Sequence, residues 1–237
     1  MCALEMRELQ ESSAPLEQQK PSISATRAVA STLGAIVGLA GMEHGLFEML
    51  QGNVTTNGLV IDAIGPAQKL WSGATEPALA IVPNFFVSGI LAMIVGLLVT
   101  IWAVGFVQRK YGALILLLLS ITLFLVGGGS PPIFLGVVAS AVATRINKPL
   151  TWWRTHLNVN ARNFLAKLWP WSIIAFVLIF WFAVAMAITG WPLVLFFDAN
   201  ATNTLPILSL LGYISDGVML LAVLAGFAYD IQRKVAE

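Results

Sequence analysis

The chain consists mainly of long apolar runs separated by short polar connections. Six runs are long enough, or nearly so, to cross about 30 Å of hydrocarbon, which takes about 20 helical residues. They cover residues 26–50, 77–107, 112–129, 131–146, 169–195 and 206–230. This pattern predicts an all-α integral membrane protein, a six-transmembrane-helix bundle. The fourth run would span only about 24 Å, so the pattern leaves open whether that helix crosses completely.

Polar segments at both ends complete the predicted organisation. Residues 1–25 have mixed charge and no apolar core, which predicts a solvated tail ahead of a transmembrane domain at 26–230. Residues 231–237 form a second short tail. The long connection 51–76 contains an apolar group, Leu59 to Ile61 and Ile64, so we expect it to lie on the membrane surface or fold back over the bundle.

Composition supports a membrane protein and argues against a nucleic-acid-binding or a disulfide-bonded protein. The chain is 58% hydrophobic and 11% charged, whereas soluble domains are about a quarter charged. We therefore expect the lipid bilayer as a partner. A net charge of +1 and the absence of a long basic run give no reason to expect nucleic acid. The single cysteine, Cys2, excludes an internal disulfide.

The basic residues predict an orientation. Of the 13 lysines and arginines, all but Lys69 fall on one side of the six-helix arrangement. Because cytoplasmic loops are enriched in these residues, both termini are predicted to be cytoplasmic, in the cell membrane. Tryptophans near both ends of the fifth run, Trp169 and Trp191, are separated by about 33 Å of helix, which matches the distance between interfacial aromatic belts.

The first run carries a ridge of glycines on one helical face. At 100° per residue, five glycines fall between about 160° and 220° from Glu43. They are Gly34, Gly38, Gly41, Gly45 and Gly52. Small residues let another helix approach closely, and Glu43 on the opposite face also needs protein around it. We therefore expect this helix to be central. Its glycines also offer a surface for a membrane-protein partner or a second copy of the chain.

Five polar residues can meet in the outer half of this bundle. Glu43, His44 and Glu48 belong to the first helix, Asn84 to the second and Asp216 to the sixth. Helical rise places Glu43 and His44 about 9–10 Å below the outer end of their helix. Glu48 lies only about 3 Å below that end, where it can reach water.

Three interpretations of this group stay open. Buried carboxylates beside an imidazole can exchange protons or small cations. A divalent metal such as Zn²⁺, Mn²⁺ or Fe²⁺ is the second interpretation, with His44 and Glu48 as weak candidate ligands at i, i+4 spacing. The third is a hydrogen-bonded group that fixes helix register. No other cofactor is evident, and the glycines at 127–129 lack the GK[ST] sequence of a phosphate loop.

The predicted function is transport or binding of a proton, cation or small polar solute. Glu43 and Asp216 would supply charge, His44 would titrate, and Asn84 would be a neutral ligand. The alternative is a non-catalytic accessory or assembly subunit of a larger membrane complex. A membrane-embedded metallo-enzyme using Glu43, His44, Glu48 and Asp216 is the third hypothesis. It comes last because the sequence favours a role other than catalysis.

Overall fold

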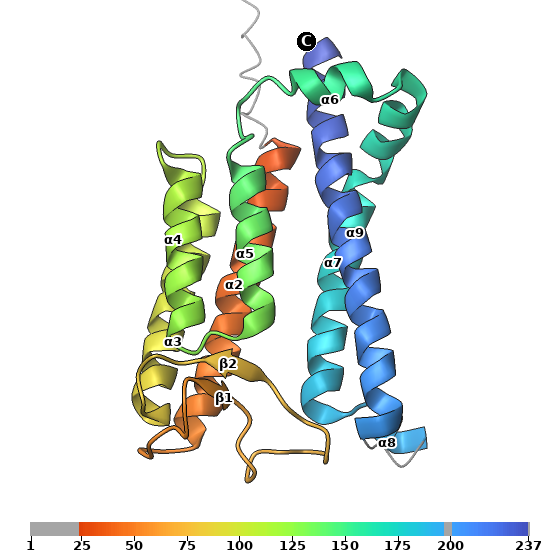
Figure 1. The fold of residues 1–237 in the computed structure, drawn as a ribbon. Helices are drawn as coiled ribbons and strands as arrows, with labels where there is room; N and C mark the ends of the chain where they lie inside the picture. The colour runs from red at the N-terminus through yellow and green to blue at the C-terminus, as the bar shows by residue number, and fades with distance from the viewer. Residues whose placement is uncertain (1–23, 197–200, 237) are drawn as a thin grey trace, which may run out of the picture.

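The computed structural model describes residues 24–196 and 201–236, and is 72% helical (Figure 1). Its elements are α2 (Ala25–Leu50), β1 (Val60–Asp62), β2 (Pro77–Leu79), α3 (Phe85–Ile101), the π-helical turn η1 (Trp102–Phe106), α4 (Gly112–Leu125), α5 (Ser130–Ala143), α6 (Thr151–His156), α7 (Val159–Thr189), α8 (Leu193–Phe196) and α9 (Ala201–Ala236). Most of the predicted N-terminal tail, residues 1–23, lies outside the described residues.

Four helical segments are long and apolar enough to span a membrane. They are α2, α3 continued through η1, α7, and residues 204–233 of α9. α4 and α5 are apolar but have 14 residues each, about 21 Å of helix. The chain is therefore a polytopic helical membrane protein, while the predicted count of six spans depends on these two shorter helices.

Several predicted helix boundaries are wrong. The second helix begins at Phe85 instead of residue 77, because β2 precedes it and the side chain of Asn84 caps its first turn by accepting from the N–H of Val87. α4 ends at Leu125, ahead of Gly127, whose positive φ of 107° turns the chain. α5 likewise covers 130–143 instead of 131–146.

The last two long helices are longer than predicted. α7 begins at Val159, ten residues before the predicted start at 169, and Asn158 caps it. It ends at Thr189, six residues before the predicted end at 195, where Gly190 adopts a left-handed φ of 69°. α9 extends beyond both predicted ends, 206 and 230.

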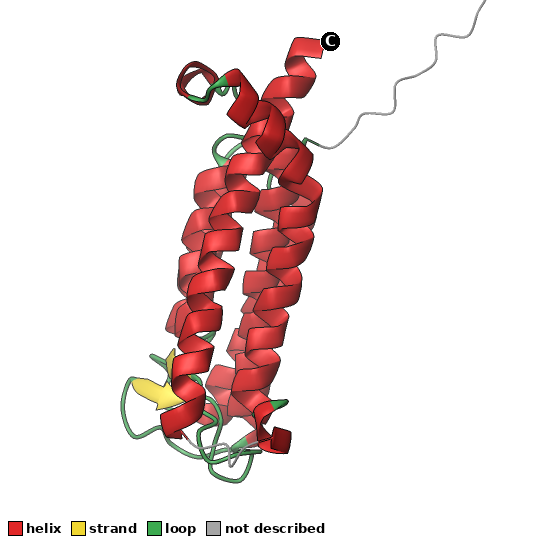
Figure 2. Ribbon diagram, turned by 90° about the vertical axis from the view of Figure 1, so that its right-hand side faces the viewer, coloured by secondary structure: helices red, strands yellow, loops and turns green. Residues whose placement is uncertain are grey.

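The helices form two groups joined by α2. α3, α4 and α5 pack with α2, and α7 pairs with α9 (Figure 1). α2 also contacts α9, so it touches both groups. Its apolar window is 61% buried, against 17–33% for the other three long segments. The long helices lie roughly along one axis, and the strands lie at the end opposite the C-terminus (Figure 2). We call the strand-bearing end the hairpin end and the opposite end the α6 end.

Glycines allow the backbones of α2 and α3 to touch. A Cβ added to Gly45 would lie 2.6 Å from the carbonyl oxygen of Gly89. A Cβ added to Gly96 would lie 2.6 Å from the carbonyl oxygen of Gly38. Another glycine of α2, Gly41, faces the side chain of a leucine in α4. Helices of this chain thus cover Gly34, Gly38, Gly41 and Gly45, whereas Gly52 has no described atom near its Cβ position.

Asp230 of α9 joins the beginning of α2. The backbone N–H groups of Ala25 and Thr26 donate to its two carboxylate oxygens at 2.8 and 2.9 Å, and all three residues are buried. An anion is stabilised at a helix N-terminus because the unpaired N–H groups there carry partial positive charge. α9 therefore caps α2 at the α6 end.

The connection between α2 and α3 folds back over the bundle. β1 and β2 pair antiparallel, with Val60 opposite Leu79. Ile64 and Trp71 are buried, and the indole N–H of Trp71 donates to the carbonyl of Ala187 in α7 at 2.9 Å. Of the two positions expected for this connection, the structure has the one over the bundle.

Candidate functional site

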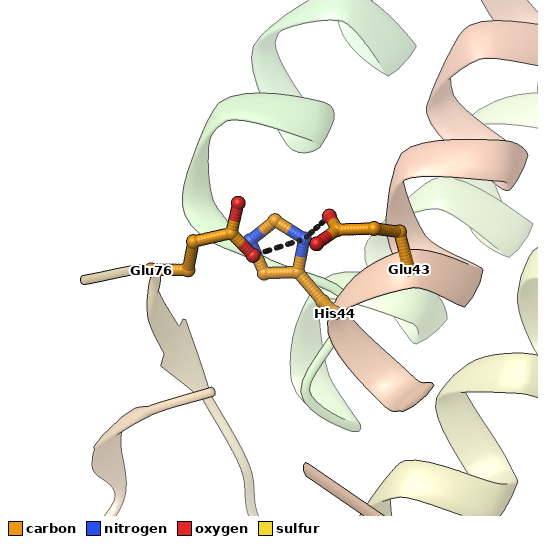
Figure 3. A group of neighbouring side chains, drawn as sticks. All are labelled: Glu43, His44 and Glu76. Carbon is orange, nitrogen blue, oxygen red and sulfur yellow. Dashed lines mark ion pairs between the residues drawn. The ribbon is translucent and has the colours of Figure 1, made fainter. Parts of the chain in front are cut away.

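Three ionisable side chains meet at the hairpin end. Glu43 and His44 belong to α2, and Glu76 immediately precedes β2 (Figure 3). The Nδ1 atom of His44 lies 3.2 Å from Oε2 of Glu43 and 3.5 Å from Oε2 of Glu76. It also lies 3.0 Å from the carbonyl oxygen of Ala40, one turn earlier. We call Glu43, His44 and Glu76 the triad.

The small sheet fixes the position of Glu76. Its backbone N–H donates to Oδ1 of Asp62 at 2.8 Å, and its carbonyl accepts the N–H of Ala63 at 2.9 Å. Asp62 ends β1, so strand pairing holds the backbone of Glu76 against the end of β1. Its side chain then reaches the imidazole of α2 (Figure 3).

The triad is buried and carries excess acid. His44 is 5% exposed and Glu76 7%, and the Glu43 side chain is 19% exposed. Within the part of the chain that the structure describes, no lysine or arginine forms an ion pair with either carboxylate; Lys69 instead pairs with Asp62. Even a protonated imidazole would balance only one of the two carboxylates. Burial raises the pKa of the Glu76 carboxyl to about 8.

Carboxylate oxygens in the triad have unused hydrogen-bonding capacity. Among the described residues, both oxygens of Glu43 and Oε2 of Glu76 are buried and accept no hydrogen bond, although Nδ1 of His44 lies beside the two Oε2 atoms. In folded proteins most buried polar atoms have a hydrogen-bond partner, so these three oxygens are exceptions. Such atoms are the places where a cation or a proton can bind.

A glycine turn at 127–129 packs against two side chains of α2. Gly129 has a positive φ of 81°, and a Cβ there would lie 2.5–2.7 Å from ring carbons of His44. Gly127 has a φ of 107°, and its Cβ would lie 2.7 Å from the carboxyl carbon of Glu48. The absence of side chains at this turn therefore leaves room for the imidazole and for Glu48.

The expectation that Glu48 reaches water is wrong. Glu48 is 0% exposed, and its Oε2 accepts the Ser88 hydroxyl of α3 at 2.6 Å. The short distance between Glu48 and the end of α2 predicted contact with water, but the turn at Gly127 covers this side chain. His44 directs its Nδ1 toward Glu43 and Glu76, so the predicted pairing of His44 with Glu48 as metal ligands is not the arrangement found.

A cavity of about 610 Å³ extends from the triad between the two helix groups. α2, α5, α7 and α9 contribute its walls, together with residues 75–77. All three triad residues line it, and so does Asp216 of α9. Much of the remaining lining is apolar, including Phe134, Leu135, Phe180, Val184 and Met219. Its volume falls in the usual range for small-molecule sites.

The structure brings together only some of the predicted site residues. Glu43 and His44 touch, and Asp216 shares their cavity. Asn84 is outside this group: it caps α3 and its amide donates to the side chain of Asn53 at 2.7 Å. Glu76 was missed, although its position directly before an apolar run was a signal that a carboxylate lay close to the outer end of the bundle.

No protein-family model, curated protein or solved structure matches this chain.

Proposed function

We propose that this membrane protein binds a small cation, the proton included, at the triad and passes it into the cavity that Asp216 lines. The observation that carries the proposal is the buried excess of carboxylate in the triad. Glu43 and Glu76 face one imidazole, without a lysine or arginine paired to them in residues 24–196 and 201–236. A buried carboxylate without a counter-charge costs several kcal/mol, so a proton or cation has to be held there.

The hydrogen bonding favours binding over a purely structural role. Glu48 joins α2 and α3 through the Ser88 hydroxyl, which donates to its Oε2, and it does not line the cavity, although its Oε1 is also buried without a partner. The triad differs because its unpaired carboxylate oxygens belong to residues that line the cavity. Asp216 gives that cavity a further carboxylate, which is suited to receive a cation leaving the triad.

We also propose the orientation that the basic residues predict, with six spans and both termini in the cytoplasm. The start of α2, the turn between α3 and α4, and the end of α9 lie at the α6 end (Figure 1). Arg27, Arg109 and Arg233 belong to these segments, whereas Lys69 belongs to the connection at the hairpin end. In this orientation the triad faces the exterior, and the glycine contacts between α2 and α3 support the centre of the bundle.

Reconstitution into vesicles tests the proposal. A pH-sensitive dye inside the vesicles reports proton movement under a potassium diffusion potential, and sodium-, potassium- and zinc-sensitive dyes report the other ions. Wild-type protein should move one of these cations. Glu43→Gln and Asp216→Asn should each abolish most of that movement, and the double variant should be no worse than either single variant if they act in one path.

Glu48→Gln provides the matched control. It makes the same chemical change on the same helix, but Glu48 does not line the cavity, so cation movement should persist. Full movement by Glu43→Gln contradicts the proposal. A wild-type protein that moves no cation also contradicts it, and stoichiometric co-purification of a second membrane protein would then favour the accessory-subunit hypothesis.

A further inference from the structure

We infer that the triad is a binding site for a divalent transition metal, with Zn²⁺ the best fit, held by Glu43, His44 and Glu76. The inference rests on the proposed function because it names the cation that the triad binds. Three protein ligands of the nitrogen and oxygen type leave a fourth position for a ligand from the cavity that all three residues line. Three protein ligands with an open position are the usual arrangement of a reactive or exchangeable zinc site.

The distances between the ligand atoms suit zinc. Two ligands bound to tetrahedral Zn²⁺ at about 2.0–2.1 Å lie about 3.3 Å apart. Nδ1 of His44 lies 3.2 Å from Oε2 of Glu43 and 3.5 Å from Oε2 of Glu76. All three ligand atoms lie within 4.8 Å of one another, so the two carboxylates have to approach each other to reach the separation of about 3.3 Å in a tetrahedral zinc site.

Charge balance selects a divalent ion. In the metal-bound form the two carboxylates have lost their protons and the imidazole is neutral, so the ligands carry two negative charges, which a divalent ion cancels and a monovalent ion does not. The imidazole nitrogen disfavours Mg²⁺ and Ca²⁺, which prefer oxygen ligands only. Zn²⁺ and Fe²⁺ both accept a mixture of nitrogen and oxygen ligands. Zn²⁺ fits best, because it is usually tetrahedral in proteins and the two distances from Nδ1 of His44 suit that geometry.

Independent features hold the ligand atoms ready. Oε2 of Glu76 is buried and lacks a hydrogen-bond donor among the described residues, although its backbone is fixed by the strand pair. Gly129 packs against the imidazole ring and limits its movement away from the carboxylates. In the metal-free arrangement Nδ1 donates to the Ala40 carbonyl, so a metal on Nδ1 has to replace that proton, and the ring proton then resides on Nε2.

Metal counting on the purified full-length chain tests the site. Protein in detergent is incubated with Zn²⁺, freed of excess ion and analysed by mass spectrometry, which should give one zinc per chain. Glu43→Gln and Glu76→Gln should each weaken zinc binding by at least about tenfold, the loss that follows even removal of an outer-shell partner. Glu48→Gln, a buried carboxylate of the same helix that is not in the triad, should retain zinc.

A spectroscopic measurement keeps the test valid if a variant fails to fold. Co²⁺ in wild-type protein should show the intense visible absorption of a four-coordinate ion, and Zn²⁺ should displace it. Wild-type protein that retains no metal overturns the inference, and so does retention of equal zinc by all three glutamine variants. If zinc is absent but Glu43 is needed for proton movement in vesicles, the inference fails and the proposed function stands. If zinc is bound through the triad but no cation moves, the site is real and its transport role is wrong.

Discussion

Replacing Gly129 with alanine tests how the glycine turn positions the imidazole. Gly129 has φ 81° and ψ 154°, a region that only glycine adopts readily, so a side chain there costs about 1–3 kcal/mol. The new Cβ would also overlap Nε2 of His44 and lie 2.5 and 2.7 Å from its Cδ2 and Cε1. Because ordinary contact begins at 3.4 Å, the imidazole would have to move by at least the difference for Cδ2, about 0.9 Å.

This movement should be costly both to the fold and to the triad. Forcing extra atoms into a packed site costs about 1–3 kcal/mol, so Gly129→Ala should lower the free energy of unfolding by about 2–6 kcal/mol in total. The displaced Nδ1 also leaves the position that Glu43 and Glu76 share. We expect a lower melting temperature in detergent and a smaller rise of that temperature on adding Zn²⁺.

Gly52→Ala is the control that separates the two costs. Gly52 has a similar φ of 86°, and no described atom lies within 4 Å of its Cβ position. It belonged to the predicted glycine ridge, but it follows the end of α2 and faces open space. Its alanine variant should show backbone strain alone, with normal zinc binding. If Gly129→Ala melts no lower than Gly52→Ala and responds to zinc like wild type, the reasoning about the turn is wrong.

Three further predictions concern packing, capping and orientation. Gly38→Ala places a Cβ 2.8 Å from a backbone nitrogen of α3 and should destabilise the bundle by about 1–3 kcal/mol. Gly217→Ala, with open space around it, should melt at or above the wild-type temperature, and equal melting of the two variants would remove the close contact from the argument. Asp230→Asn keeps the shape of the α2 cap but removes its charge, so melting in the same detergent should show a loss of about 0.5–2 kcal/mol; an unchanged melting temperature would count against the cap. Reporter fusions after Lys110 and near Gly58 should report cytoplasm and exterior respectively, and a cytoplasmic Gly58 would refute the proposed orientation.

Hydrophobic runs located the helices better than they located the helix ends. The first run, 26–50, differs by one residue from α2, because an uninterrupted apolar pattern continues to its last turn. The second run was assigned from residue 77, although residues 77–79 form a strand. Short apolar segments suit either element, and pairing with Val60–Asp62 decides between them. That pairing is a tertiary contact, and no local pattern contains it.

The candidate site was predictable where its residues share one helix. Glu43 and His44 are adjacent charged residues in an apolar run, so their burial follows from hydropathy. Glu76 depends on the fold of a long connection, so its contact with His44 required the structure. Asn84 follows a proline and precedes an apolar run, which is typical of a helix N-cap. Because the second apolar run was assigned from residue 77, the prediction placed Asn84 inside the helix and not at its start.

The bond between Asp230 and the start of α2 has a consequence for biosynthesis. The two partners are separated by 205 residues, which take about 10–40 s to translate at about 5–20 residues per second. During that interval the newly made α2 has to satisfy its first N–H groups with water or headgroups. A nascent chain truncated before Asp230 lacks this cap, so the completed arrangement of α2 is reached only late in synthesis. The cap on α2 therefore distinguishes a finished bundle from an unfinished one.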